Sequence, residues 1–134
     1  MQLTREQIRQ LVAQARRDAP NETCGIIGGK NKRALRIYPL PNTHATPRVN
    51  FYAAPLALLN AFQDIEAHGW AHLAIYHSHC ATEAYPSETD LARAYYPDAI
   101  HLLISLMNPE QASVRAFRIA ERKITEITLE VEDD

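Results

Sequence analysis

Apolar residues follow two different spacings along the chain, and the first stretch has the period of a helix. Its apolar positions recur every three or four residues: Ile8, Leu11, Val12 and Ala15. Thr4 with Gln7 three positions later forms a capping box, which marks the start of a helix. We therefore predict a helix over residues 5–18, ending before Pro20 because the residue that precedes a proline disfavours helical geometry.

Later segments alternate between strand-like and helix-like patterns. Strands are predicted at residues 23–29, 34–38, 71–76, 100–105, 114–119 and 124–131, with 49–52 as a further candidate. Two more helices are predicted, over residues 56–67 between Pro55 and Gly69, and over residues 88–95. The proline-rich stretch 39–47 is a loop, and the acidic tail from Glu130 is expected to fray. Helices and strands alternate in the first part of the chain, and strands cluster in the last part. This order predicts an α/β (α+β) fold, a mixed sheet with helices packed on it.

Composition narrows the class of protein. A length of 134 residues fits one domain, residues 1–134, and 46% hydrophobic with 22% charged residues fits a soluble globular protein. A net charge of −2 argues against nucleic acid as the main partner. Four arginines give the first helix a basic face, which we interpret as solvated: Arg5, Arg9, Arg16 and Arg17. The chain shows no apolar leader and no apolar run of 18 residues, so we expect a cytoplasmic protein with no membrane partner. In that compartment its two cysteines are expected to be reduced thiols.

Two histidines follow the apolar run of residues 71–76. His77 and His79 are two residues apart, and in a strand such residues point to the same face. Asp90 follows in the first turn of a predicted helix. Two imidazole nitrogens and one carboxylate oxygen are the ligand set of a catalytic zinc whose fourth position stays open. The stretch from Ser87 to Asp90 is also a capping box, and the capping and ligand interpretations are compatible.

A catalytic zinc lowers the pKa of a water toward ~7 and polarises a carbonyl, so hydrolysis also needs a nearby carboxylate that is not a ligand. Glu22 is the favoured candidate, because it precedes a short apolar strand that can lie beside the histidine strand. Three other glutamates qualify by composition alone: Glu66, Glu83 and Glu88.

The order of these residues resembles a known family. Glu22, then His77-Ser78-His79, then Ser87 and Asp90 form the pattern of the JAMM metalloproteases, also called the MPN-plus domain. The resemblance extends over nearly the whole chain and implies the JAMM/MPN fold, which is similar to that of cytidine deaminases: a curved mixed sheet flanked by helices.

The resemblance also implies roles for the residues. His77, His79 and Asp90 would hold one Zn²⁺ per chain, Glu22 would be the general base and acid, and Ser87 would hydrogen-bond the oxyanion. Nucleobase deamination, which shares the broad fold, is disfavoured because the chain has no Cys-x-x-Cys.

A departure from the family pattern points to a subgroup. Most JAMM sequences have proline where this chain has Cys80, and the turn of residues 81–87 is similar to that of the bacterial CysO-cysteine, or sulfur-carrier adduct, peptidases. This likeness implies a small ubiquitin-like or sulfur-carrier partner with a C-terminal Gly-Gly tail, and release of cysteine in cysteine biosynthesis. A general deubiquitinase-like isopeptidase and a metal-free MPN scaffold remain alternatives.

Other residues have less specific interpretations. Cys24 and Cys80 are either thiols close to the metal or, as we favour, small buried side chains. The remaining histidines are interpreted as structural or surface residues, with a possible place beside the substrate channel for the first: His44, His68, His72 and His101. Phe51 and Tyr52 are candidates for lining a peptide groove, and the other large aromatics are assigned to packing: Trp70, Tyr95 and Tyr96.

Overall fold

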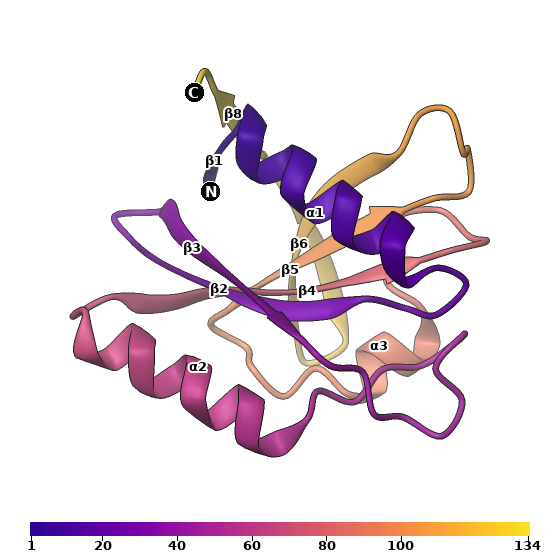
Figure 1. Ribbon diagram of the computed structural model, residues 1–134, viewed down its shortest axis with the longest axis horizontal. Coiled ribbons are helices and arrows are strands. Elements are labelled where there is room, and N and C mark those ends of the chain that lie inside the picture. Colours follow the sequence, from indigo (N-terminus) through magenta and orange to yellow (C-terminus); the bar gives the residue numbers. More distant parts are fainter.

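A computed structural model describes all residues, 1–134, and contains three helices and eight strands (Figure 1). The helices are α1 (Arg5–Asp18), α2 (Pro55–Ala67) and α3 (Glu88–Ala92). The strands are β1 (Gln2–Thr4), β2 (Cys24–Lys30), β3 (Arg33–Leu40), β4 (Ala71–His79), β5 (Ile100–Ser105), β6 (Ser113–Ala120), β7 (Lys123–Ile127) and β8 (Glu130–Glu132). They form one mixed sheet in the order β7-β6-β5-β4-β2-β3-β1-β8. The predicted fold class, a curved mixed sheet flanked by helices, is confirmed.

Most predicted elements are present, and two of them end three residues away from the predicted position. The bounds of α1 and β5 are those predicted, and Thr4 and Gln7 make both hydrogen bonds of the capping box. Strand β4 continues three residues beyond the prediction, to His79. Helix α3 ends at Ala92 rather than at residue 95. The stretch Tyr95-Tyr96-Pro97, two residues further on, combines weak helix formers with a proline and disfavours a longer helix.

Two strand predictions are wrong. Residues 49–52 form no strand, because their loop is held by the Asn42 side chain, whose Oδ1 accepts hydrogen bonds from the backbone N–H groups of His44 and Tyr52. The predicted strand 124–131 is divided into β7 and β8, which lie at opposite edges of the sheet.

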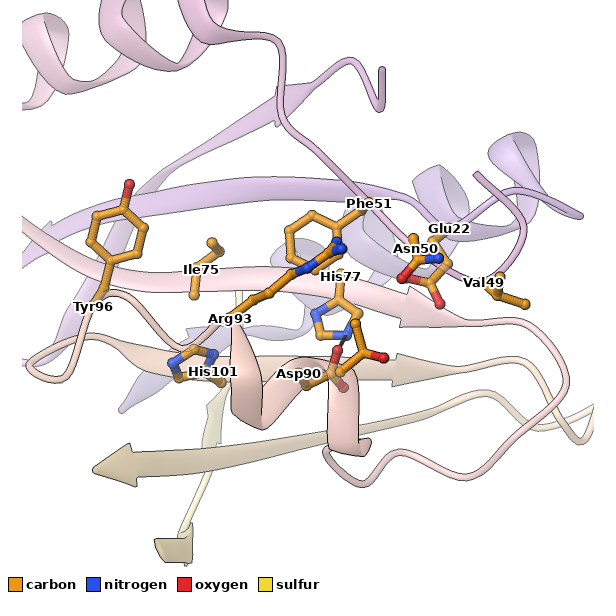
Figure 2. A pocket seen from close by; sticks show the side chains of 11 residues that line it. Glu22, Val49, Asn50, Phe51, Ile75, His77, Asp90, Arg93, Tyr96 and His101 are labelled. Carbon is orange, nitrogen blue, oxygen red and sulfur yellow. Dashed lines mark ion pairs between the residues drawn. The ribbon is translucent and has the colours of Figure 1, made fainter. Parts of the chain in front are cut away.

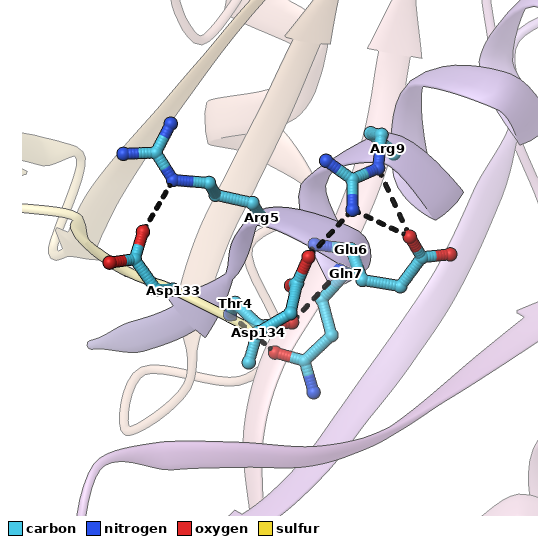
Figure 3. Close-up of polar contacts among 7 residues, drawn as sticks. All are labelled: Thr4, Arg5, Glu6, Gln7, Arg9, Asp133 and Asp134. Atoms are coloured by element: carbon cyan, nitrogen blue, oxygen red, sulfur yellow. Dashed lines mark hydrogen bonds and ion pairs between the residues drawn. The ribbon is translucent and has the colours of Figure 1, made fainter.

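The acidic tail does not fray. Strand β8 pairs in parallel with β1, an element that the sequence did not predict, and Gln2 lies opposite Glu130. The tail then contacts the basic face of α1 (Figure 3): Asp133 pairs with Arg5 at 2.9 Å and Asp134 with Arg9 at 2.7 Å. These arginines are therefore bound to the chain's own C-terminal residues.

Alternation along β4 assigns its side chains to two layers. Ala74 and Tyr76 belong to the core that also contains the buried side of α1. Ile75 packs in the second core, beneath α2, and by the two-residue period His77 lies on that same face. By the same period His79 also lies on the face of the sheet that α2 covers.

Gly25 of β2 is required by this layering. Tyr76 lies opposite it in β4, and a Cβ atom at position 25 would approach the tyrosine hydroxyl oxygen to 2.2 Å and the backbone carbonyl of Tyr38 to 2.5 Å. Tyr76 donates a 2.6 Å hydrogen bond to Gln14 of α1, which fixes the helix to the sheet. No helix is both long and apolar enough to span a bilayer.

Candidate metal centre

Three predicted ligands converge on one point, and Figure 2 shows two of them, His77 and Asp90. His77 Nε2 lies 3.1 Å from Asp90 Oδ1, His79 Nε2 lies 3.1 Å from Asp90 Oδ2, and the two Nε2 atoms are 3.2 Å apart. The exposed fractions of the side chains are 3%, 6% and 10%, so the cluster is shielded from bulk water. The strand spacing brings the histidines together, and the start of α3 brings the carboxylate to them.

Ser87 fixes Asp90 at the start of α3. The Ser87 hydroxyl oxygen accepts a hydrogen bond from the Asp90 backbone N–H at 3.1 Å, and the Ser87 N–H donates to Asp90 Oδ2 at 2.8 Å. The capping box is therefore present, and the same carboxylate still faces both histidines. A carboxylate held by its own helix start loses little conformational freedom on binding a cation.

The imidazole rings are oriented by their surroundings. His79 Nδ1–H donates to the backbone carbonyl of Glu83 at 3.0 Å, which leaves Nε2 as the free nitrogen toward the cluster. The ring of His77 stacks on Phe51, with 4.6 Å between the centroids. Both rings are thus held with a nitrogen directed at Asp90.

The electrostatics of the cluster favour a bound cation. Burial opposes ionisation of Asp90, but hydrogen bonds from His77 and His79 outweigh it and hold the pKa of Asp90 well below its ordinary value. Burial lowers the pKa of His79, and the hydrogen bond to Asp90 outweighs this effect and raises that pKa. An ionised carboxylate between two oriented imidazoles is a donor set that fits zinc.

Glu22 lies in the same pocket as His77 and Asp90. Its exposed fraction is 7%, its N–H donates to the carbonyl of Pro47 at 2.7 Å, and its carbonyl accepts from Asn42 at 2.9 Å. Burial raises the pKa of Glu22 to about 7; the charge of His79 opposes this rise and that of Asp90 adds to it. The carboxyl group can therefore accept or release a proton near neutral pH. The other candidate glutamates are exposed and do not line this pocket: Glu66, Glu83 and Glu88.

Sequence reasoning missed a contribution from Ser78, the residue between the two histidines. Its side chain points away from the cluster and accepts a 2.8 Å hydrogen bond from the N–H of Thr23, while its own N–H donates to the carbonyl of Thr23. These bonds fix the segment that carries Glu22 against β4. The sequence shows that Ser78 lies between the two histidines, but it does not show that Ser78 bonds to Thr23, because that contact depends on the order of the strands.

Neither cysteine belongs to the ligand cluster. Cys24 is fully buried with its thiol 3.5 Å from the carbonyl of Leu40, and burial raises the pKa of this thiol to about 12. Cys80 is half-buried, its thiol lies 3.5 Å from the carbonyl of Asn21, and burial raises its pKa as well. For Cys24, the favoured interpretation as a small buried side chain agrees with the structure.

An apolar groove of about 670 Å³ adjoins the metal pocket. Four residues line both the groove and the pocket: Phe51, Ile75, Arg93 and Tyr96. Tyr52 and His44 also line the groove, as proposed for them, and so do Tyr95 and Tyr96, which the sequence pattern assigns to packing. The groove therefore offers a path from the surface to the ligand cluster.

His101 does not fit its assignment to structure or surface alone. It is 7% exposed and lines the metal pocket, and its Nε2 atom has no hydrogen-bond partner. No sequence pattern indicates this role, since His101 lies within a strand made mostly of apolar residues.

Comparison with known proteins identifies the family. Residues 4–120 match the family model for prokaryotic homologs of the JAB domain, Prok-JAB. The chain belongs to this family. With the ligand cluster, membership makes the chain a JAMM-type metallopeptidase, as the sequence pattern implied.

Relatives and solved structures are consistent with this assignment. The chain is 38% identical over 122 residues to the CysO-cysteine peptidase of Mycobacterium tuberculosis, covering 87% of this chain and 80% of that protein. It is 44% identical over 78 residues to a probable TtuB-protein conjugate cleaving protease of Thermus thermophilus, covering 58% and 52%. A JAB1/MPN domain protein from Archaeoglobus fulgidus has the same fold, with a TM-score of 0.67 at 20% identity over 98% of this chain and 97% of that one.

Proposed function

We propose that this protein is a zinc-dependent peptidase that cleaves the amide bond after the C-terminal glycine of a small ubiquitin-like or sulfur-carrier protein. The observation that carries the proposal is a buried carboxylic acid, Glu22, in the same pocket as His77 and Asp90, two of the three convergent candidate ligands. The proposal includes one zinc ion per chain, a single catalytic domain over residues 1–134 and action in the cytoplasm.

The residues have distinct roles. His77, His79 and Asp90 hold the zinc, which when bound supplies Lewis acidity that activates water and polarises the scissile carbonyl. Glu22, with a pKa of about 7, takes a proton from the attacking water and delivers it to the leaving amine. Ser87 donates to the oxyanion: its oxygen already accepts from the Asp90 N–H, so its hydroxyl hydrogen remains available.

The groove supports a polypeptide substrate. An extended tail fits a channel lined largely by apolar side chains, and it reaches the ligand cluster through the four shared residues. The likeness to the mycobacterial CysO-cysteine peptidase favours a carrier–cysteine adduct as the substrate, with cysteine released. The likeness to the Thermus conjugate-cleaving protease favours the second candidate, a general isopeptidase.

One experiment tests both candidates. The purified protein is loaded with one equivalent of zinc and incubated with a carrier that ends in Gly-Gly. The last glycine is joined either to cysteine or to the lysine side chain of a protein, and the products are identified by mass spectrometry. Faster cleavage of the first substrate supports cysteine release, and faster cleavage of the second supports the isopeptidase. Stoichiometric zinc with cleavage of neither would contradict both and favour a non-catalytic scaffold.

A further inference from the structure

His101 contains the one buried side-chain nitrogen or oxygen atom of the chain that has no hydrogen-bond partner, Nε2. It lies in β5 opposite Ile75 of β4, on the face of the sheet that carries His77. A buried polar atom without a partner destabilises the folded state, and such atoms are rare in folded proteins. Its presence in the wall of the metal pocket indicates a partner that the free protein does not supply.

The pocket limits what that partner can be. The cavity is small, with a volume of about 30 Å³, and Phe51, Ile75 and Tyr96 form apolar walls around it. A narrow cavity of this kind favours the main chain of glycine over a residue with a bulky side chain. Burial and the nearby His77 lower the pKa of His101 to about 4, so the imidazole is neutral at pH 7. A neutral nitrogen suits an uncharged amide group.

The position of His101 indicates which part of the substrate it contacts, namely the carrier tail rather than the leaving group. Figure 2 shows Glu22 with Val49 and Asn50 toward one end of the pocket, and Tyr96 with His101 toward the other. Because Glu22 protonates the leaving amine under the proposed function, the leaving group lies near Glu22. The carrier tail then enters from the end at which the pocket meets the apolar groove through Ile75 and Tyr96.

We propose that His101 is a substrate-binding residue whose Nε2 atom hydrogen-bonds the main chain of the glycines at the carrier's C-terminus. The inference rests on the proposed function and extends it to a residue outside the metal ligands and Glu22. It explains why a strand made mostly of apolar residues carries a buried polar side chain that has no partner.

The test measures binding rather than turnover. In a zinc-loaded Glu22→Gln background, the dissociation constant is measured for a ubiquitin-like sulfur carrier that ends in Gly-Gly and bears cysteine on the last glycine. We expect His101→Leu to raise Kd about tenfold, equivalent to ~1.4 kcal/mol, without lowering the Tm, because the substitution removes an unpaired polar atom. His101→Gln restores a nitrogen at the end of the side chain and is expected to recover much of the affinity.

His72→Leu is the matched control. His72 is a neighbouring, partly buried histidine, but its Nε2 already donates to the carbonyl of Ala74 at 3.1 Å, and it does not line the metal pocket. We expect this variant to lower the Tm and leave Kd unchanged. A carrier that lacks its last two glycines should bind the His101→Leu variant and the parent equally.

The outcomes separate the two proposals. If the zinc-loaded wild-type protein cleaves neither carrier adduct, the proposed function fails. If it cleaves an adduct but His101→Leu binds with the parent Kd, the role of His101 alone is refuted. A lower Tm together with a weaker affinity in both His101 variants would also refute the role of His101 in binding, because that pattern indicates a structural residue.

Discussion

The Glu22→Gln substitution should change stability in a way that depends on pH. Glu22 is nearly excluded from solvent, and burial raises its pKa from 4.5 to about 7 in the folded protein. Glutamine has almost the same shape but no charge. In the metal-free protein, the variant should therefore be more stable than the parent wherever the parent carries a buried negative charge.

The sign and size follow from the two pKa values. Below about pH 4.5 the acid is protonated in both the folded and unfolded states, so its burial has no effect of this kind on stability. As the pH rises, the unfolded chain ionises first, and the parent loses stability until the folded form also ionises near pH 7. A pKa difference of about 2.5, at ~1.36 kcal/mol per pKa unit, gives about 3 kcal/mol above pH 7.

Urea unfolding of both proteins in EDTA, between pH 4 and pH 8, measures this difference directly. The free energies of unfolding should agree near pH 4, and the variant should exceed the parent by about 3 kcal/mol at pH 8. Titrating groups that do not interact with Glu22 are common to both proteins and cancel in the comparison. A difference that stays constant across this range would refute the inference that Glu22 is an acid with a raised pKa. The zinc-loaded variant should also lack peptidase activity while it retains the metal.

Three further predictions concern the site and the sheet. Asp90→Asn should abolish stoichiometric zinc binding, as measured by metal analysis, because it removes the charged ligand between the two imidazoles. Ser78→Ala should keep zinc but lower kcat about tenfold in a carrier-cleavage assay, since the segment that carries Glu22 loses its hydrogen bond to β4. Wild-type kcat in that variant would contradict the positioning role. Gly25→Ala should reduce the free energy of unfolding by about 1–3 kcal/mol in urea, because its Cβ overlaps Tyr76 and a backbone carbonyl.

The local parts of the site were predictable from sequence. The two-residue period of a strand places His77 and His79 on one face, and helix-start chemistry places Asp90 beside them. Both arguments concern residues close together in the chain. Glu22 was only a favoured candidate until the family pattern supported it, because nothing local indicates that β2 pairs with β4.

The parts that were missed depend on strand order. Ser78 holds a segment 55 residues away, and His101 reaches the pocket because β5 lies parallel to β4. The tail was expected to fray because its partners, β1 and the arginines of α1, lie at the opposite end of the sequence. Periodicity describes which face a side chain occupies, but not which distant segment covers it.

The division between β7 and β8 has a consequence for how the sheet meets other molecules. Ile127 and Glu130 belong to opposite edges of the sheet, yet only two residues lie between them. Three peptide steps span at most about 11 Å, so the edges approach each other at this corner and the sheet curls toward a closed barrel. Edge strands that face each other are poor templates for pairing between molecules. Deleting residues 130–134 should uncover β1 and promote self-association, which light scattering detects. The deleted residues do not line the metal pocket.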